Sequence, residues 1–420
     1  MSEEMEKQEA AAESAAIIDS TKITKQEMST LKGDNVGESL YSGTWILSTL
    51  LSLSKVHEKD SWNEKMENDL CLLWDMTADK DVVQYLIGHD FFKIAEYSLK
   101  SSEEPRLLEI IVGMIGNLAC DPDVLEKVAN EKELIDLILR LLTSEDAGTI
   151  VQILRLLHSV LWSIQNNPES RWRRILKDSR IPSVTLPFIL RSSTNRDLLI
   201  STINLLRTSF EISQLAKTSN ILLEDIEAPL IIPDLVDAIE EVLSQEEDMY
   251  STTIVNFLEG WLELVSGITE NHESLEAETL NRMFGMLRRI LVDFQDPWNL
   301  MPLDEIKASC IHCCSTIILR FRWRGNVQED VLFEADCAVV SIIYKLKIAI
   351  KKEESDPEDT MKELLKYLEG YWSEISSVST LEEVSKILAA TEKEAIENSI
   401  DVLKSRIPDD KQDSTIKALP

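Results

Sequence analysis

The stretch Pro105–Leu142 reads PRLLEIIVGMIGNLACDPDVLEKVANEKELIDLILRLL. Its first part carries two adjacent apolar stripes at helical spacing: Leu107, Ile111, Met114 and Leu118, then Leu108, Val112, Ile115 and Ala119. Two such stripes predict a helix that is buried over most of its circumference. Asp121 suits an N-cap and Pro122 suits the first helical position, so these residues end one helix and start the next. An apolar helix, a short helix and a second apolar helix make one unit of an α-solenoid.

Two glycines lie within the first of these helices. Gly113 and Gly116 each lower helix propensity by about 1 kcal/mol relative to alanine. Such glycines are tolerated where a neighbouring helix packs close to the backbone. We therefore expect a close approach between helices at these positions.

The same pattern recurs along the chain. Further apolar helices are predicted at Ile150–Ile164, Leu198–Ile212, Ile254–Ile268 and Ile306–Phe321. Pro122 and Pro168, which mark two of the breaks, are 46 residues apart. That spacing is typical of armadillo and HEAT repeats. The fold class we predict is all-α, an armadillo/HEAT-like α-solenoid of stacked helical repeats with a disordered N-terminal tail.

Composition changes along the chain give the expected domain boundaries. Residues 1–35 form a disordered acidic tail, and residues 36–350 form the helical solenoid. Residues 351–359 (KKEESDPED) form a charged linker, followed by C-terminal helices at 360–406 that pack on the end of the solenoid. Residues 407–420 form a polar tail.

The charge restricts the partners that we expect. The chain has 420 residues, 44% of them hydrophobic, and a net charge of −32. This charge argues against general nucleic-acid binding and against an anionic membrane surface. A basic partner or a local basic groove stays open, and so does the simpler interpretation that acidic residues keep a long solenoid soluble.

Sequence features also bear on location. The first residues, MSEEMEKQEA, are acidic and polar, so we expect no secretory signal. We expect no uninterrupted apolar run long enough to span a bilayer. The six cysteines mostly lie on apolar helical faces and are expected to be reduced.

Three blocks carry a family resemblance: LYSGTWILSTL from Leu40, DLCLLWDMTADKDV from Asp69, and PRLLEIIVGMIGNLACDPDV from Pro105. In order and spacing they closely resemble the serum-amyloid-A-like, synoviocyte-proliferation-associated protein family. The resemblance is strong from Leu40 to Leu142 and fades beyond Leu206. It implies an armadillo-like fold, a nuclear location, a link to the promotion of cell proliferation, and no assigned enzymatic activity.

Candidate partner-binding residues follow from the armadillo pattern, in which Asn and Trp side chains line a groove and bind an extended segment. The candidates are Asn117, Trp162, Gln165, Asn166 and Trp261. Gly113 stands one turn before Asn117, where such repeats usually have Trp. The alternatives are that Asn117 bridges adjacent helices and that the tryptophans are core residues.

Two clusters interleave arginine with tryptophan. Arg171, Trp172, Arg173 and Arg174 form the first, and Arg322, Trp323 and Arg324 belong to the second. Such clusters can hold acidic or aromatic ligands through cation–π and bidentate contacts. In an acidic chain they can equally pair with carboxylates of the protein itself.

The segment Cys310-Ile311-His312-Cys313-Cys314 contains residue types that bind metal ions. Its side chains point in several directions from a predicted helix, and only Cys337 offers a further ligand nearby. We therefore expect no metal site, and we expect no cofactor.

No catalytic template is found in the sequence, which contains no GxGxxG, Walker, GxSxG or HExxH motif. We predict a non-enzymatic protein–protein interaction scaffold whose partners are one or more proteins. An alternative is a regulatory subunit that docks an enzyme through its termini or convex face. A third reading, nucleic-acid binding through the arginine–tryptophan clusters, conflicts with the net charge.

Overall fold

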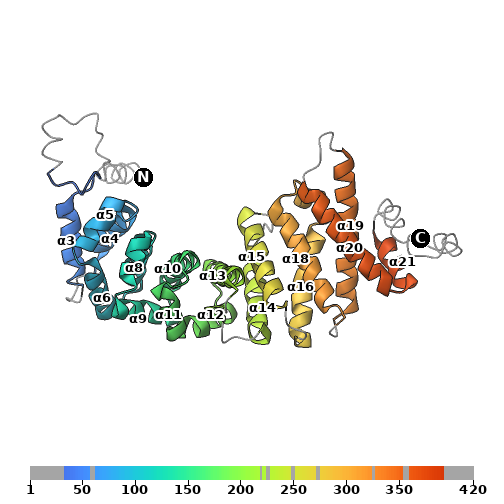
Figure 1. The fold of residues 1–420 in the computed structure, drawn as a ribbon, viewed down its shortest axis with the longest axis horizontal. Helices are drawn as coiled ribbons and strands as arrows, with labels where there is room; N and C mark the ends of the chain where they lie inside the picture. The colour runs from blue at the N-terminus through green and yellow to red at the C-terminus, as the bar shows by residue number, and fades with distance from the viewer. Residues whose placement is uncertain are drawn as a thin grey trace, which may run out of the picture. The chain divides into compact units, whose positions relative to one another are not determined.

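The computed structural model describes residues 33–56, 62–217, 220–223, 228–246, 251–270, 275–323, 327–352 and 359–391. The chain divides into two compact units, Met1–Ile181 and Pro182–Pro420. Each unit is a stack of α-helices, and no strand occurs in the described ranges (Figure 1). The all-α solenoid fold predicted from the sequence is confirmed.

The first unit is built mainly from helices of 7 to 14 residues, with the longer helix α10 near its end. Its helices are α3 (Gly43–Leu53), α4 (Glu64–Met76), α5 (Lys80–Gly88), α6 (Phe91–Ser101), α7 (Pro105–Leu118), α8 (Pro122–Val128), α9 (Lys132–Arg140), the 3₁₀ turn η1 (Leu141–Thr143), α10 (Ala147–Asn166) and α11 (Arg171–Ser179). Helices α4, α7 and α10 pack in series as one layer, and α3, α6 and α9 form a second layer. The first layer carries four of the five candidate groove residues: Asn117, Trp162, Gln165 and Asn166.

The second unit stacks pairs of long helices. It contains α12 (Ile181–Ser192), α13 (Arg196–Ala216), α14 (Ala228–Ser244), α15 (Thr252–Ile268), α16 (Ala277–Asp293), α17 (Pro297–Leu300), α18 (Glu305–Phe321), α19 (Glu329–Lys352), α20 (Asp359–Val378) and α21 (Leu381–Ala390). Helices α13, α15, α18 and α20 pack in series, and α14, α16, α19 and α21 form the layer behind them. The predicted packing of C-terminal helices on the end of the stack is seen for α20 and α21, as far as Ala390.

Side-chain caps start the short helices at each repeat boundary. Asp79, Asp121 and Ser170 cap α5, α8 and α11 by accepting a hydrogen bond from the N–H two residues later, at 2.8, 2.9 and 3.3 Å. These bonds satisfy backbone donors that have no partner within the helix. The helix break predicted at Asp121-Pro122 is therefore confirmed, with Pro122 at the first helical position.

Helix α7 is the most buried helix of the first unit. All eight residues of its two predicted apolar stripes are buried, and α7 packs against α4 on one side and α10 on the other. At Gly113 the indole of Trp74 in α4 lies so close that a Cβ atom would be 2.0 Å from its Cζ2. Nothing lies within 4 Å of the corresponding position at Gly116, so the close approach predicted for both glycines occurs only at Gly113.

The second unit repeats this arrangement. A Cβ atom on Gly267 of α15 would be 2.1 Å from Cε1 of Phe210 in α13. In both units an aromatic ring from one helix therefore occupies the space that a glycine leaves on the next helix of the same layer.

The described structure differs from the expected segment boundaries at two places. Asp34 and Asn35, assigned to the tail, belong to the folded part, where Asp34 accepts bonds from Ser42 and Thr44 at the start of α3. Lys351 and Lys352, assigned to the linker, are the last residues of α19. Residues 1–32 of the predicted N-terminal tail, residues 392–406 of the predicted C-terminal helices and the predicted polar tail 407–420 lie outside the described residues.

Helix α10 requires a correction to the expectation about apolar runs. Among the described residues it is the one helix long and apolar enough to cross a membrane by length and composition, with a mean hydropathy of 1.3. Half of that window is buried within the protein, and α10 packs along α7. These contacts are those of a core helix in a helical stack.

The contrast between the two glycines of α7 gives a first prediction. Gly113→Ala gains helix propensity but forces Cβ into the Trp74 indole, so we expect a net loss of about 1–3 kcal/mol in the free energy of unfolding. Gly116→Ala has open space and is expected to gain about 0.5–1 kcal/mol. Urea unfolding followed by circular dichroism measures both. Equal effects of the two substitutions would contradict the packing described here.

Candidate functional site

One face of α10 carries a row of exposed side chains. Arg155, Trp162 and Asn166 are spaced by seven and four residues, which places them on one side of the helix. Trp162 is 56% exposed, although most of α10 is buried against its neighbours. An exposed tryptophan in line with an arginine is the chemical feature that distinguishes this face. We call Asn117, Arg155, Trp162, Gln165 and Asn166 the α7–α10 face.

Asn117 lies at the junction of three helices of the first layer. Its Nδ2 donates to Thr77 Oγ1 at 2.9 Å and to the Trp74 carbonyl at 3.4 Å, both at the end of α4. Its Oδ1 accepts from Arg155 Nη2 of α10 at 3.5 Å. The amide donors are thus directed at the neighbouring helix, which matches the alternative that Asn117 bridges adjacent helices.

Arg155 was not among the sequence candidates. Its Nη1 donates to Gln152 Oε1 at 2.6 Å, and its Nη2 reaches Asn117, so the guanidinium is held between α7 and α10 while remaining exposed. The sequence does indicate that Arg155 shares a helix face with Trp162, because it precedes Trp162 by seven residues, or about two helical turns. Gln165 is half-buried and Asn166 is exposed at the end of the same helix.

Trp261 does not lie on a groove surface. It is fully buried between α14 and α15, where its Nε1 donates to the Leu235 carbonyl at 2.8 Å. Its proposed role as a partner-groove residue is therefore corrected to that of a core residue. Its polar atom has a partner inside the protein, as buried indoles usually do.

The first arginine–tryptophan cluster is divided by the fold. Trp172 is buried, and its Nε1 donates to the Leu125 carbonyl of α8 at 3.1 Å, so it is not available to a ligand. Arg171 donates to Asn130, in the turn that follows α8. Arg174 is exposed and Arg173 is half-buried. The cluster thus fastens α11 to the preceding repeat and lacks an exposed aromatic partner.

The second cluster contains a buried ion pair. The guanidinium of Arg322 binds Asp336 through two bonds of 2.8 and 2.6 Å, and Tyr371 donates its hydroxyl to the same carboxylate at 2.7 Å. Asp336 is fully buried, which raises the pKa of its carboxyl, while Arg322 opposes that shift. Trp323 is exposed beside Arg322, and Arg324 lies outside the described residues. For Arg322, pairing with a carboxylate of the protein itself is what the structure shows.

The cysteine-rich segment of α18 contributes to the core. Cys310 and Cys314 are buried, Cys313 is half-buried, and His312 is exposed on another side of the helix. Burial raises the pKa of the Cys310 and Cys314 thiols well above their usual value. Within the part of the chain that the structure describes, no three His, Cys, Asp or Glu side chains are grouped so as to hold a metal ion.

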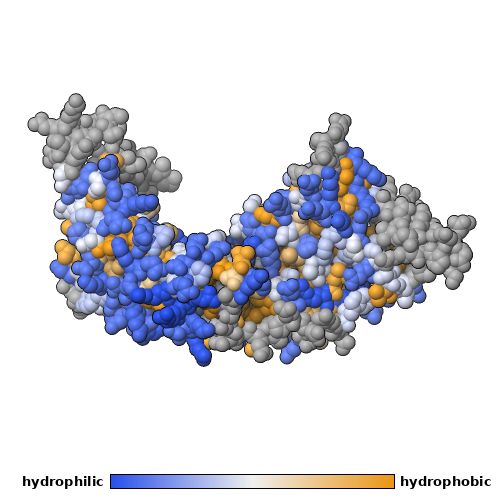
Figure 2. All heavy atoms as spheres, viewed as in Figure 1, coloured by the Kyte–Doolittle hydropathy of each residue, from blue (hydrophilic) through white to orange (hydrophobic). Residues whose placement is uncertain are grey.

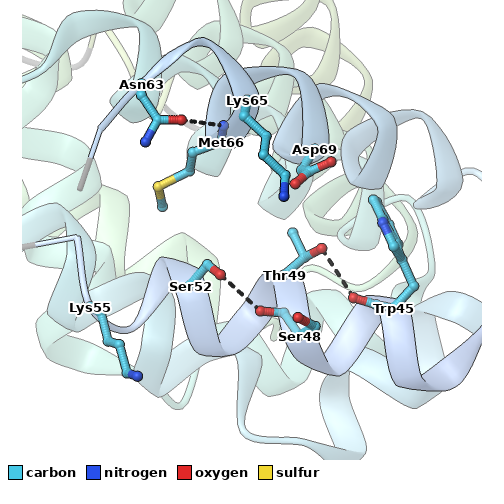
Figure 3. A pocket seen from close by; sticks show the side chains of 9 residues that line it. All are labelled: Trp45, Ser48, Thr49, Ser52, Lys55, Asn63, Lys65, Met66 and Asp69. Atoms are coloured by element: carbon cyan, nitrogen blue, oxygen red, sulfur yellow. Dashed lines mark hydrogen bonds between the residues drawn. The ribbon is translucent and has the colours of Figure 1, made fainter. Parts of the chain in front are cut away.

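A polar cavity of about 400 Å³ lies between α3 and α4 (Figure 3). Its lining consists of Trp45, Ser48, Thr49, Ser52, Lys55, Asn63, Lys65, Met66 and Asp69. Thr49 and Ser52 donate to carbonyls of their own helix, and Lys65 extends toward Asp69 (Figure 3). The hydroxyls of Thr49 and Ser52 thus already have acceptors, and the cavity is lined by both lysine and aspartate.

Comparison with known proteins adds family information. No family profile matches the chain. Protein saal1 of Danio rerio is 30% identical over 265 residues, which are 59% of this chain and 55% of that protein. Protein SAAL1 of Mus musculus is 32% identical, and that of Homo sapiens 31% identical, each over 181 residues, or 40% of this chain and 38% of theirs. The chain is a homologue of the SAAL1 proteins.

The matches cover only part of these relatives. The chain spans about half the length, or less, of the curated SAAL1 proteins that it matches. A solved structure of an engineered protein aligns with 85% of this chain at 13% identity and a TM-score of 0.30, a likeness too low to carry an argument.

The bonds of Asn117 give a second prediction. Asn117→Ala removes its donors to Thr77 and Trp74, so we expect a loss of about 1 kcal/mol in the free energy of unfolding. The control Asn166→Ala removes an exposed amide of the same face and is expected to stay within about 0.5 kcal/mol of the wild type. Chemical denaturation measures both. An unchanged stability for Asn117→Ala would refute the bridging role.

The buried ion pair gives a third prediction, tested by a double-mutant cycle. Arg322→Met leaves the buried Asp336 carboxylate without its counter-ion and is expected to cost about 3–5 kcal/mol. The double variant Arg322→Met/Asp336→Leu removes both charges and should cost less than Arg322→Met alone. Tyr371→Phe should cost about 1–2 kcal/mol. Simply additive losses in the cycle would mean that the pair is not coupled.

Proposed function

We propose that this protein is a non-enzymatic scaffold that binds another protein through the α7–α10 face. The observation that carries the proposal is the exposure of Trp162 in line with Arg155. Trp172, Trp261 and Trp372 are buried, as expected for tryptophans in a helical stack. Trp162, like Trp298 and Trp323, instead presents a large ring to solvent. Tryptophan and arginine are the residue types most enriched at the energetic centres of protein interfaces.

The geometry also defines the kind of partner. Trp162 provides an apolar contact area, and Arg155 provides a positive charge that Asn117 and Gln152 hold in place. The matching segment therefore carries an apolar or aromatic side chain and, about two helical turns away, an acidic group. Asn117 contributes by positioning Arg155 rather than by binding the backbone of the partner, because its own donors are engaged with α4.

The relationship to the SAAL1 proteins supports the wider setting of this proposal. Together with the family resemblance, it is the reason to propose action in the nucleus and a role in promoting cell proliferation. A regulatory subunit that docks an enzyme through another surface is the alternative function, and the experiment below distinguishes the two.

The fourth prediction tests the face directly. We expect Arg155→Ala/Trp162→Ala to lose a defined set of partners in quantitative affinity capture from cells, because both anchoring side chains are removed. Trp298, which is 88% exposed on α17 in the second unit, provides a matched control: Trp298→Ala also removes an exposed indole and should keep those partners. Circular dichroism first confirms that all three proteins are equally folded.

The pattern of losses decides between the functions. If the double variant keeps the full partner set of the wild type, the proposal for the α7–α10 face is wrong. If Trp298→Ala loses partners that the double variant keeps, binding occurs through another surface, as the regulatory-subunit alternative requires.

A further inference from the structure

A second cavity, of about 450 Å³, lies between α18 and α20 in the second unit. Its lining consists of Glu305, Ala308, Ser309 and His312 from α18 and Thr360, Glu363, Leu364 and Tyr367 from α20. The volume falls in the range of about 300–1,000 Å³ that is typical of ligand pockets. None of the residues proposed for partner binding lines it, so it is a feature in addition to the α7–α10 face.

The charged groups of this cavity are all negative. Glu305 and Glu363 are exposed, one on each wall, and neither has an ion-pair partner among the described residues. Lys307 is on the same helix turn as Glu305 but directs its Nζ to the Pro302 carbonyl at 2.9 Å. Behind the lining, Ser309 bonds to Glu259, a half-buried carboxylate of α15. A cation entering the cavity would therefore meet two carboxylates, one from each helix.

Aromatic rings form another part of the wall. The rings of His312 and Tyr367 lie with their centroids 4.0 Å apart and are tilted by 52°. A hydrogen bond of 2.7 Å between Tyr367 and Thr316 fixes the phenol. Partial desolvation of the imidazole lowers the pKa of His312, although the residue is exposed overall, and burial raises the pKa of Tyr367. The face of a tyrosine ring attracts a cation, and the neighbouring imidazole adds contact area beside it.

We propose that the α18–α20 cavity binds a lysine or arginine side chain from a basic segment of a partner protein. Carboxylates on two opposing helices supply charge-assisted hydrogen bonds, the aromatic pair supplies a cation–π contact, and Ala308 and Leu364 contact the aliphatic stem. A metal ion is a poorer occupant, because the described residues offer no group of three ligating side chains. The net charge of −32 attracts basic partners over longer distances and so favours their encounter with this site.

The fifth prediction uses a fluorescein-labelled peptide of lysine, glycine and serine and its counterpart with glutamine in place of lysine. The full chain should bind the lysine peptide and not the glutamine peptide in fluorescence anisotropy. Glu305→Gln/Glu363→Gln should raise the Kd at least about tenfold, because both charge-assisted contacts are lost. Tyr367→Leu should raise it about two- to fivefold, and Tyr367→Phe, which keeps the ring, should change it less.

A matched control removes the same charge elsewhere. Glu276→Gln/Glu278→Gln neutralises two exposed carboxylates at the start of α16, and neither lines the cavity. If this control weakens the peptide as much as Glu305→Gln/Glu363→Gln does, binding reflects the overall acidic surface and the proposed site is wrong. Displacement of the peptide by Ca²⁺ but not by NaCl of equal ionic strength would identify a metal site instead. The Arg155→Ala/Trp162→Ala variant should bind the peptide normally, so this site and the α7–α10 face can fail independently.

Discussion

No repeat of this protein can bury its apolar surface alone, and the burial of α7 shows how the stack meets that constraint. Its two apolar stripes face two directions, and α4 and α10 cover them. Because apolar burial is the main favourable term in folding, α7 stabilises the fold only while both neighbours are in place. The polar contacts of Asn117 at the end of α7 join the same three helices, so packing and hydrogen bonding define one arrangement.

How much of this could be predicted from the sequence depends on whether the information is local. The stripes of α7 and the cap at Asp121 follow from residues within two helical turns, and both predictions are confirmed. The residues that share a helix face with each tryptophan also indicate whether it is exposed or buried. Trp162 is seven residues after Arg155 and four before Asn166, whereas Trp261 is seven after Ile254 and four before Val265. The apolar content of the two helices does not distinguish the exposed Trp162 from the buried Trp261, so a prediction based on that content assigns both to the groove.

Contacts between segments far apart in the sequence cannot be predicted from such local patterns. The ion pair of Arg322 joins the end of α18 to Asp336 in α19, and Tyr371 reaches it from α20. Nothing in the local pattern around Arg322 names either partner. The same holds for Arg207 and Arg282, each of which lies between carboxylates supplied by a neighbouring helix. Basic side chains are thus used to join neighbouring helices of the stack.

The contact of Trp74 with Gly113 has a consequence for assembly. Helices that pack through aliphatic side chains can slide by one turn and still bury similar surface. Here a slip of one turn would bring Glu109 or Asn117 under the indole in place of Gly113, and either side chain would collide with the ring or be buried without its partners. Gly113 therefore restricts α4 and α7 to one register when the repeats assemble. The contact of Gly267 with Phe210 restricts α13 and α15 in the same way in the second unit.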